Sequence, residues 1–438
     1  MNLRLKQLSL FLKSRLGMSL VGFLFFGFIL YNALGIHSHG VRFNYQSQIF
    51  TDKAGYQVYL PSLFYYNFDG NAMPDSIEHK TGRGFMIDNG KIVSKYPIGV
   101  SCLQLPFFSV AMLIEADSHQ EKGYSVIQHK ALDWSTSFYV AFGFFLLFVV
   151  LTSYENLDPL RVLVGLSLLL CCSNLLYYST RDAGMSHGYS FFLFSVLIFL
   201  FYRIRYKEKR WLFFVVPIVL CLVFLVRHIN IVFVLIPVLF YVYRLKLKVL
   251  SLCKKYYLVI TCGVIIAIGL VSLQLIYNNY AFGTLSFDSY KSEGFTNFYN
   301  LDVAFLLIAP DTGLFIYSPV YLAILIYTIA THRLQLIEKT ILVLGFVLIG
   351  VVYMAWSSPG LGCAVGHRGY TEHLAYFALP LCLFINHISR RWLYFFMLLG
   401  LLLGIVYWLF MSHFDGCWHG DSHYDWHYFF KVLKQKQW

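Results

Sequence analysis

Residues 16 to 36 read LGMSLVGFLFFGFILYNALGI, a continuous apolar run with no charged side chain. A helix needs roughly 20 apolar residues to cross about 30 Å of hydrocarbon, so this stretch is long enough to span a bilayer. It is too long for the core of a signal peptide and ends without a small-residue cleavage site. Four basic residues precede it, namely Arg4, Lys6, Lys13 and Arg15. The stretch therefore predicts an uncleaved first span whose N-terminal flank is cytoplasmic.

Apolar runs of this kind recur along the whole chain. The 438 residues are 58% hydrophobic and 13% charged, with a mean hydropathy of +0.62, which is too apolar for a soluble globular protein. We therefore expect an all-α, polytopic membrane protein that forms one integral domain over residues 1 to 438. The further runs cover residues 97 to 116, 134 to 153, 160 to 179, 186 to 202, 211 to 243 (long enough for two spans), 256 to 277, 314 to 330, 340 to 356, 370 to 388 and 392 to 411.

The distribution of Lys and Arg predicts the topology. Two strongly basic loops, residues 203 to 210 and 244 to 255, should both be cytoplasmic. This requires a hairpin at residues 227 to 230, and it requires the run at 97 to 116 to lie on the outer surface as an interfacial helix. Eleven spans result, with a cytoplasmic N-terminus and an extracytoplasmic C-terminus. The expected outer segments are residues 37 to 133 with interfacial helices, 278 to 313, 357 to 369, and the tail at 412 to 438.

Several other chemistries are not indicated by the sequence. The net charge of +12 follows from the basic loops, so we expect no nucleic-acid partner. The nine cysteines are scattered without CxxC spacing, and the sequence predicts neither a disulfide framework nor a zinc knuckle. There is no P-loop, GxGxxG, HExxH or GxSxG motif, so the motifs of soluble nucleotide-binding proteins and hydrolases are absent.

The stretch FTDKAGYQVYLP, residues 50 to 61, follows the first span and carries Asp52 on the predicted outer side. A carboxylate at the mouth of a low-dielectric cavity can accept a proton from an attacking hydroxyl group. Fixed cations at such a site stabilise a phosphate leaving group more than they would in water. Arg227 stands out among the cations, because an ionisable group between two apolar half-runs is costly unless it faces a polar cavity. The outer-side candidates are Lys53, Arg83, Lys95, Arg181, Arg227 and Arg368.

Each candidate also has a plainer explanation. Asp52 could cap a helix or be a solvated loop acid. Lys95 could anchor an interfacial helix by reaching the headgroups, and Arg227 could end a helix and bind lipid. His187 and His367 fit a structural role better than an acid–base role. The residues alone leave these alternatives open.

Six short motifs occur in order along nearly the whole chain. They are Asp52 with Gly55-Tyr56 and Tyr59-Leu60-Pro61; Lys95 to Gly99 before Leu105 to Phe108; Met185 to His187; Leu225 to Arg227; Gly313 to Pro319; and Gly366 to Gly369. Together they resemble the GT-C superfamily of polyprenyl-phosphate-sugar-dependent glycosyltransferases, in particular bacterial relatives of the protein-mannosyl and lipid A aminoarabinose transferases. The resemblance implies a sugar carried on a polyprenyl phosphate and transferred on the outer face, with Asp52 as the base.

The resemblance, taken with the residue chemistry, suggests a division of roles. Many members of the superfamily carry a second acid beside the first, whereas Lys53 follows Asp52 here, so we expect a site without metal or other cofactor. The donor phosphate is assigned to Lys95, Arg227 and Arg368, with Arg83, Arg181 and Lys53 as further candidates. The sugar or acceptor is assigned to Tyr56, Tyr59, His187 and His367.

The expected function is therefore that of an inverting glycosyltransferase of the bacterial cytoplasmic membrane. Its partners would be membrane lipid, a polyprenyl-phosphate-linked sugar as donor, and a glycan, glycolipid or protein as acceptor. An O-antigen polymerase or ligase is the nearest alternative, although its largest outer loop usually lies late in the chain and here the first is the largest. A lipid or solute transporter would need ionisable or helix-breaking residues near mid-membrane in several spans, and mainly Arg227 fits that description.

The C-terminal tail suggests one further site. In an extended strand, side chains at every second position would share a face and could form a zinc or copper surface. An amphipathic tail whose aromatic residues lie at the membrane interface is the simpler explanation of the same pattern. The alternating residues are His413, Asp415, Cys417, His419, Asp421, His423, Asp425 and His427.

Overall fold

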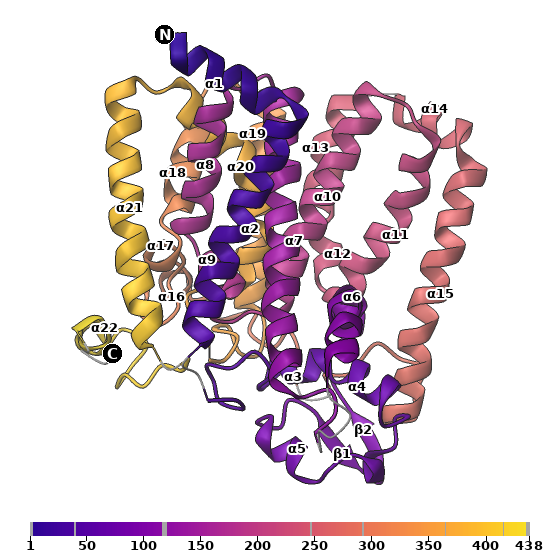
Figure 1. Ribbon diagram of the computed structural model, residues 1–438. Coiled ribbons are helices and arrows are strands. Elements are labelled where there is room, and N and C mark those ends of the chain that lie inside the picture. The colour runs from indigo at the N-terminus through magenta and orange to yellow at the C-terminus, as the bar shows by residue number, and fades with distance from the viewer. Residues whose placement is uncertain are drawn as a thin grey trace.

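The computed structural model describes residues 3–38, 41–115, 121–245, 248–290, 293–363, 365–414 and 416–434. The chain is predominantly helical in these ranges, with a single short hairpin, as expected for an all-α protein (Figure 1). Within the described residues, six helices are long and apolar enough to cross a membrane, so the protein is a multi-pass membrane protein. They are α2 (Arg15–His37), α7 (Val126–Ser153), α10 (Ser186–Tyr206), α15 (Tyr257–Phe282), α19 (Leu336–Met354) and α21 (Arg390–His413).

Four shorter apolar helices in the described part of the chain pack among the long ones. They are α6 (Gly99–Ile114), α8 (Pro159–Cys171), α11 (Arg210–Val226) and α18 (Val320–Ala330). The helix predicted at 97 to 116 is present as α6, and it packs against α7 and α11. Its N-terminus lies directly on the end of α11, because a Cβ atom added to Gly99 would be 2.3 Å from the carbonyl carbon of Leu225.

Helix α7 lies at the centre of the bundle, where it packs against α2, α6 and α10. The ring of Phe144 stacks on Phe25 of α2 at 4.5 Å and contacts Phe191 of α10 at 5.0 Å. Helices α15 and α21 lie at the two sides of the bundle (Figure 1) and expose large aliphatic side chains such as Ile268 and Leu401. Such continuous apolar exposure is what a lipid-facing helix requires.

Three of the predicted spans are interrupted by polar residues. The run at 160 to 179 forms α8 and then α9 (Leu175–Ser179), and the run at 314 to 330 forms α17 (Leu314–Tyr317) and then α18. The run at 370 to 388 forms the end of a 3₁₀ helix, η2 (Arg368–His373), and then α20 (Leu374–His387). Two of the breaks meet, because the Ser318 hydroxyl donates to the amide oxygen of Asn174 at 2.7 Å. The segment just before the third break also contacts Asn174, because the Asn174 side-chain amide donates to the Val365 carbonyl at 3.0 Å.

The hairpin expected at residues 227 to 230 is also present as a break in the helices. Helix α11 ends at Val226, and the chain continues as α12 (Asn230–Phe233) and α13 (Leu235–Leu245). Helix α14 (Lys248–Lys255) follows and lies at the same end of the bundle as α1 (Leu3–Lys13) (Figure 1). The basic segments 203 to 210 and 244 to 255 are close in space here, because Lys255 pairs with Glu208 at 3.1 Å.

The opposite end of the molecule carries a small layer formed by the first long loop (Figure 1). A hairpin of β1 (Met86–Asp88) and β2 (Lys91–Val93) pairs Met86 with Val93 in antiparallel register. Its core is separate from that of the bundle and is formed by residues such as Tyr59, Phe85 and Ile92. The short helices of this layer are α3 (Asp52–Gln57), α4 (Tyr59–Phe64), η1 (Gly70–Ala72) and α5 (Ser76–Lys80).

The C-terminal tail corrects two expectations from the sequence. Cys417 forms a disulfide with Cys363, so a disulfide is present where the spacing of the cysteines predicted none. The extended strand of alternating metal ligands is not formed, because Cys417 is in the disulfide and His427 lies in helix α22 (Trp426–Lys434). His423 pairs with Asp311 at 2.6 Å, beside α16 (Val303–Ile308), and Asp415 lies outside the described residues.

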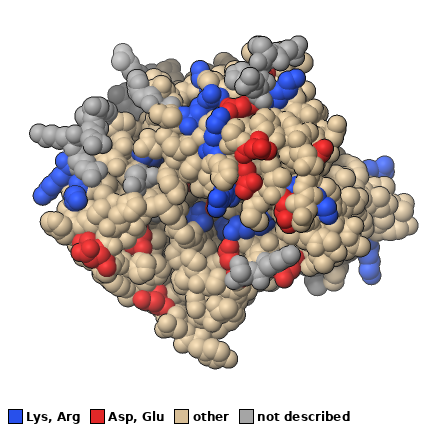
Figure 2. Space-filling view, turned by 90° about the horizontal axis from the view of Figure 1, so that it is seen from below, with Lys and Arg blue, Asp and Glu red and all other residues tan. Residues whose placement is uncertain are grey.

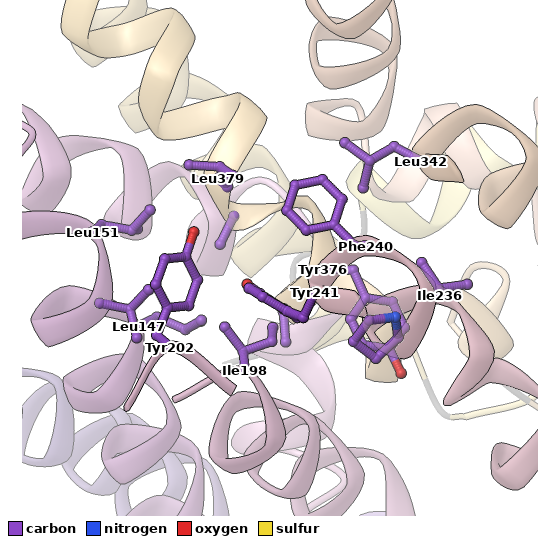
Figure 3. Close-up of a pocket in the computed structure, with 14 residues that line it drawn as sticks. Leu147, Leu151, Ile198, Tyr202, Ile236, Phe240, Tyr241, Leu342, Tyr376 and Leu379 are labelled. Carbon is purple, nitrogen blue, oxygen red and sulfur yellow. The ribbon is translucent and has the colours of Figure 1, made fainter. Parts of the chain in front are cut away.

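A small cavity lies inside the bundle between α7, α10, α13, α19 and α20 (Figure 3). It measures about 30 Å³, and its labelled side chains are aliphatic or aromatic, including Leu147, Tyr241 and Leu342. That volume holds roughly two water molecules. We regard it as a packing feature of the core rather than a ligand site.

Candidate functional site

A much larger cavity of about 690 Å³ opens between the first-loop layer and the helix bundle. Its size suits a small ligand or the head of a larger one. Charged side chains gather around the middle of the face at this end of the molecule, and some basic ones are recessed among uncharged atoms (Figure 2). The cavity brings together six of the residues chosen from the sequence, which are Asp52, Tyr56, Lys95, His187, Arg227 and Arg368.

Asp52 is the first residue of α3, and both of its carboxylate oxygens are held in the cavity. The Tyr96 hydroxyl donates to Oδ1 at 2.6 Å, and Arg368 Nη1 donates to Oδ2 at 3.3 Å. Gly55, one turn further along α3, allows this contact, because a Cβ atom there would lie 2.2 Å from the Tyr96 ring. The motif therefore needs glycine at position 55, because a larger residue would clash with Tyr96.

The surroundings of Asp52 decide its protonation. Burial alone would raise the pKa of its carboxyl group, but the charge of Arg368, the Tyr96 hydrogen bond and the charge of Lys95 together hold the pKa below its ordinary value. Tyr96 behaves oppositely, since burial and the charge of Asp52 raise the pKa of its hydroxyl group. At neutral pH the pair is therefore an ionised carboxylate that accepts a hydrogen bond from a neutral phenol.

Arg368 begins η2 and reaches Asp52 across 316 residues of sequence. Its second terminal nitrogen, Nη2, donates to the carbonyl oxygen of Leu361, which fixes the guanidinium plane. Gly366 lies just before it with φ +60°, and a Cβ atom there would be 2.5 Å from the Cβ of Tyr317. Only glycine fits this turn without a clash.

Arg227 follows the last residue of α11 and is held by a carboxylate that the sequence reasoning did not select. Its guanidinium donates to Glu372 of η2 and lies 5.6 Å from the centre of the Tyr353 ring. Glu372 also accepts a hydrogen bond from His187 Nδ1 at 3.0 Å and from the Asn230 amide at 2.5 Å. A carboxylate so close to the start of the apolar helix α20 is costly to bury. That expected cost was the sequence signal by which Glu372 could have been selected.

Lys95 also lines the cavity. Its ammonium group pairs with Glu293 at 2.6 Å and lies 5.2 Å from the centre of the Tyr290 ring. Both members of the ion pair are partly exposed, so the contact can exchange with solvent or with a ligand. Glu293, like Glu372, was not selected from the sequence.

Tyr56 packs its ring against Tyr96 at 4.6 Å, and its hydroxyl donates to Ser186 Oγ at 3.2 Å. Burial raises the pKa of the Tyr56 hydroxyl group to about 12, so it remains a neutral donor or acceptor. Ser186 begins α10 next to His187, and both line the cavity. The Met-Ser-His motif therefore adjoins the Asp52 motif in space.

The remaining candidates do not line the cavity in the described part of the chain. The Lys53 ammonium is buried and pairs with Asp182 at 2.7 Å, and the Arg181 guanidinium donates to the Met411 carbonyl. The Tyr59 hydroxyl donates to the Tyr96 carbonyl. The His367 ring lies 3.1 Å from the Pro359 carbonyl oxygen, and Arg83 adopts φ +55° in the first-loop layer. Of these, Tyr59 holds the backbone of Tyr96, which lines the cavity.

Among the described residues that line the cavity, the charges balance. Three cations, Lys95, Arg227 and Arg368, face three carboxylates, Asp52, Asp288 and Glu293. A bound phosphate would therefore take cations that now hold carboxylates, and Asp52 would gain freedom to accept a proton. No group of three or more His, Cys, Asp and Glu side chains that could hold a metal ion occurs among the described residues.

The comparisons with known proteins do not identify this cavity. No protein-family model matches the chain, and no curated protein matches it. A functional assignment must therefore rest on the residues and geometry described above.

Proposed function

We propose that the protein is an inverting glycosyltransferase of the GT-C type that moves a sugar from a polyprenyl phosphate to an acceptor hydroxyl group. The observation that carries this proposal is the single cavity that an ionised carboxylate, Asp52, lines together with two arginines and a lysine. A transferase of this kind needs a base and a phosphate site within one cavity that excludes bulk water.

The proposed reaction is a single displacement. The acceptor hydroxyl group gives its proton to Asp52 while its oxygen forms a bond to the anomeric carbon. The bond from that carbon to the phosphate oxygen breaks on the opposite side, and the electron pair leaves with the lipid phosphate. Arg368, Arg227 and Lys95 stabilise the negative charge that collects there, and Arg can do so through two parallel hydrogen bonds.

Other residues are given supporting roles in this proposal. Tyr56 and His187 would contact the sugar or the acceptor, and Tyr96 would orient the carboxylate. Neutralisation of the phosphate is assigned to side chains, since Lys53 stands where many members of the superfamily have a second acid. Lys53, Arg83, Arg181, Tyr59 and His367, which do not line the cavity, are given no contact with the sugar or the phosphate.

We further propose eleven spans in the bacterial cytoplasmic membrane, with the N-terminus inside and the cavity and C-terminus outside. The basic segments support this, because α14 lies at the end of the bundle opposite the first-loop layer (Figure 1) and Lys255 pairs there with Glu208. The Cys363–Cys417 disulfide at the cavity end supports it too, since disulfides persist in oxidising compartments. Reporter fusions after Asp75 and Lys207 should lie outside and inside, respectively, and the reverse result would contradict the topology.

The direct test is sugar transfer by the purified protein from a panel of polyprenyl-phosphate hexoses and pentoses. Transfer is measured as the release of polyprenyl phosphate. We expect Asp52→Asn to lower the transfer rate by about 10²- to 10⁴-fold, the usual contribution of a positioned base. The exposed acid Asp75 of the same loop provides a matched control, and Asp75→Asn should keep full activity. Full transfer by Asp52→Asn would refute the assignment.

A further inference from the structure

Glu372 does not line the cavity, but it connects three segments that form the cavity wall. Its side chain is fully buried, and its two oxygens accept hydrogen bonds from Arg227, His187 and Asn230. These partners come from the end of α11, the start of α10 and the start of α12. Arg227 and His187 line the cavity, whereas Glu372 does not. We call these four residues the Glu372 cluster.

Every partner presents a hydrogen-bond donor to the Glu372 carboxylate. Arg and the amide nitrogen of Asn230 can only donate, so the carboxylate is the form that satisfies them. The same contact places the hydrogen of a neutral His187 on Nδ1, which leaves Nε2 as the acceptor nitrogen of that ring. A buried carboxylate is costly unless it is paired in this way, so the cluster holds one defined geometry.

A fixed guanidinium is a better phosphate ligand than a mobile one. A free arginine side chain loses rotamer freedom when it grips an anion, and that loss weakens binding. The ion pair with Glu372 and the contact with the Tyr353 ring restrict Arg227 before any ligand arrives. Nη1 donates to Glu372, and none of the other guanidinium nitrogens donates to a described residue, so they can donate to a phosphate.

We propose that Glu372 is a positioning residue for the donor phosphate: it aims Arg227 into the cavity and sets the tautomer of His187. The inference rests on the proposed function, because it takes the cavity to be a phosphate site. It adds a residue that touches neither the sugar nor the phosphate and acts only through the two side chains it holds.

A purely structural role for Glu372 is the competing explanation, and a double-mutant cycle separates the two. The probe is farnesyl phosphate, whose binding to the full-length protein is measured in detergent for wild type, Glu372→Gln, Arg227→Gln and the double variant. Loss of one hydrogen bond to a charged group corresponds to about a tenfold weaker affinity or more, so each single variant should bind about tenfold more weakly. If Glu372 acts through Arg227, the double variant should be within about twofold of Arg227→Gln.

The chain offers a matched control for a buried ion pair. Glu338 of α19 is also buried and pairs with Arg244 at 2.6 Å, at the other end of the bundle. We expect Glu338→Gln to lower the thermal midpoint without changing farnesyl phosphate binding. Glu372→Asp keeps the charge on a side chain that is one methylene shorter, so it should recover part of the binding that Glu372→Gln loses, and it provides a second variant if Glu372→Gln does not fold.

The outcomes separate this inference from the proposed function. Wild-type protein that does not bind farnesyl phosphate would contradict the proposed function and, with it, the phosphate site. Normal wild-type binding with equal affinity in a folded Glu372→Gln variant would overturn the positioning role alone. Losses that multiply to about a hundredfold in the double variant would also overturn it, because Glu372 would then act independently of Arg227.

Discussion

Replacing Arg368 with glutamine should shift the pH dependence of transfer. Proton acceptance requires ionised Asp52, so activity is present above the pKa of Asp52 and is lost as the pH falls through it. Arg368 is the strongest of the influences that lower this pKa against the effect of burial. Without the arginine, burial remains and the pKa rises. The acid limb of kcat/KM should therefore move to higher pH in Arg368→Gln.

The size of the effect follows from the contact. Arg368 Nη1 and Asp52 Oδ2 lie 3.3 Å apart, and two opposite charges about 4 Å apart attract by about 4 kcal/mol at an effective dielectric constant of about 20. Both side chains reach the cavity, with 16% and 29% of their surfaces exposed, so solvent screening lowers the attraction to about 1 to 2 kcal/mol. Because the phosphate also loses a ligand, kcat/KM at neutral pH should fall at least about tenfold.

The assay is the initial rate of polyprenyl phosphate release between about pH 4 and pH 9, with protein integrity followed by thermal unfolding. Arg161→Gln is the matched control, because Arg161 donates to the carbonyl groups of Ile385 and Ile388 and does not line the cavity. Its acid limb should match that of the wild type. An unmoved acid limb in folded Arg368→Gln would refute the role given to this ion pair.

Three further predictions concern the supporting structure. Gly55→Ala places a Cβ atom 2.2 Å from the Tyr96 ring and should reduce transfer by about tenfold or more through a displaced Tyr96, whereas Gly27→Ala, which meets nothing within 4 Å, should leave the rate unchanged. The double variant Cys363→Ser with Cys417→Ser should lose about 2 to 4 kcal/mol of stability. A reductant should lower the thermal midpoint of the wild type but not that of this variant. Equal responses of the two proteins to the reductant would contradict the disulfide. Glu293→Gln frees Lys95 from its 2.6 Å ion pair and should tighten farnesyl phosphate binding a few-fold, so weaker binding would show that the pair positions Lys95 instead.

Much of the fold could be predicted from the sequence, because hydropathy over about 20 residues reports the length of an apolar helix. Helices α2, α7, α10, α15, α19 and α21 all fall on predicted runs. The breaks at Asn174 and Ser318 were missed, since one or two polar residues hardly change such an average. Only the three-dimensional structure shows these breaks, where the side chains of Ser318 and Asn174 form a hydrogen bond.

The candidate site could be predicted only in part, for a related reason. Asp52, Lys95, Arg227 and Arg368 were selected as charged residues on the predicted outer side, each within one of the six short motifs. The pairing of Asp52 with Arg368 joins residues far apart in sequence, so no local sequence pattern predicts it. Glu372 lies three residues beyond the Gly366 to Gly369 motif and was missed for that reason. The Cys363–Cys417 disulfide links positions 54 residues apart without a recognisable spacing.

The most direct test of the central claim compares binding with transfer in Asp52→Asn. The carboxamide removes the charge that now holds Arg368, so the variant should bind farnesyl phosphate at least as tightly as the wild type. It should nevertheless fail to release polyprenyl phosphate from a sugar donor that the wild type consumes. Asp52→Asn protein that binds the probe and still transfers sugar at the wild-type rate would contradict the account, because the proton acceptor would then be another group.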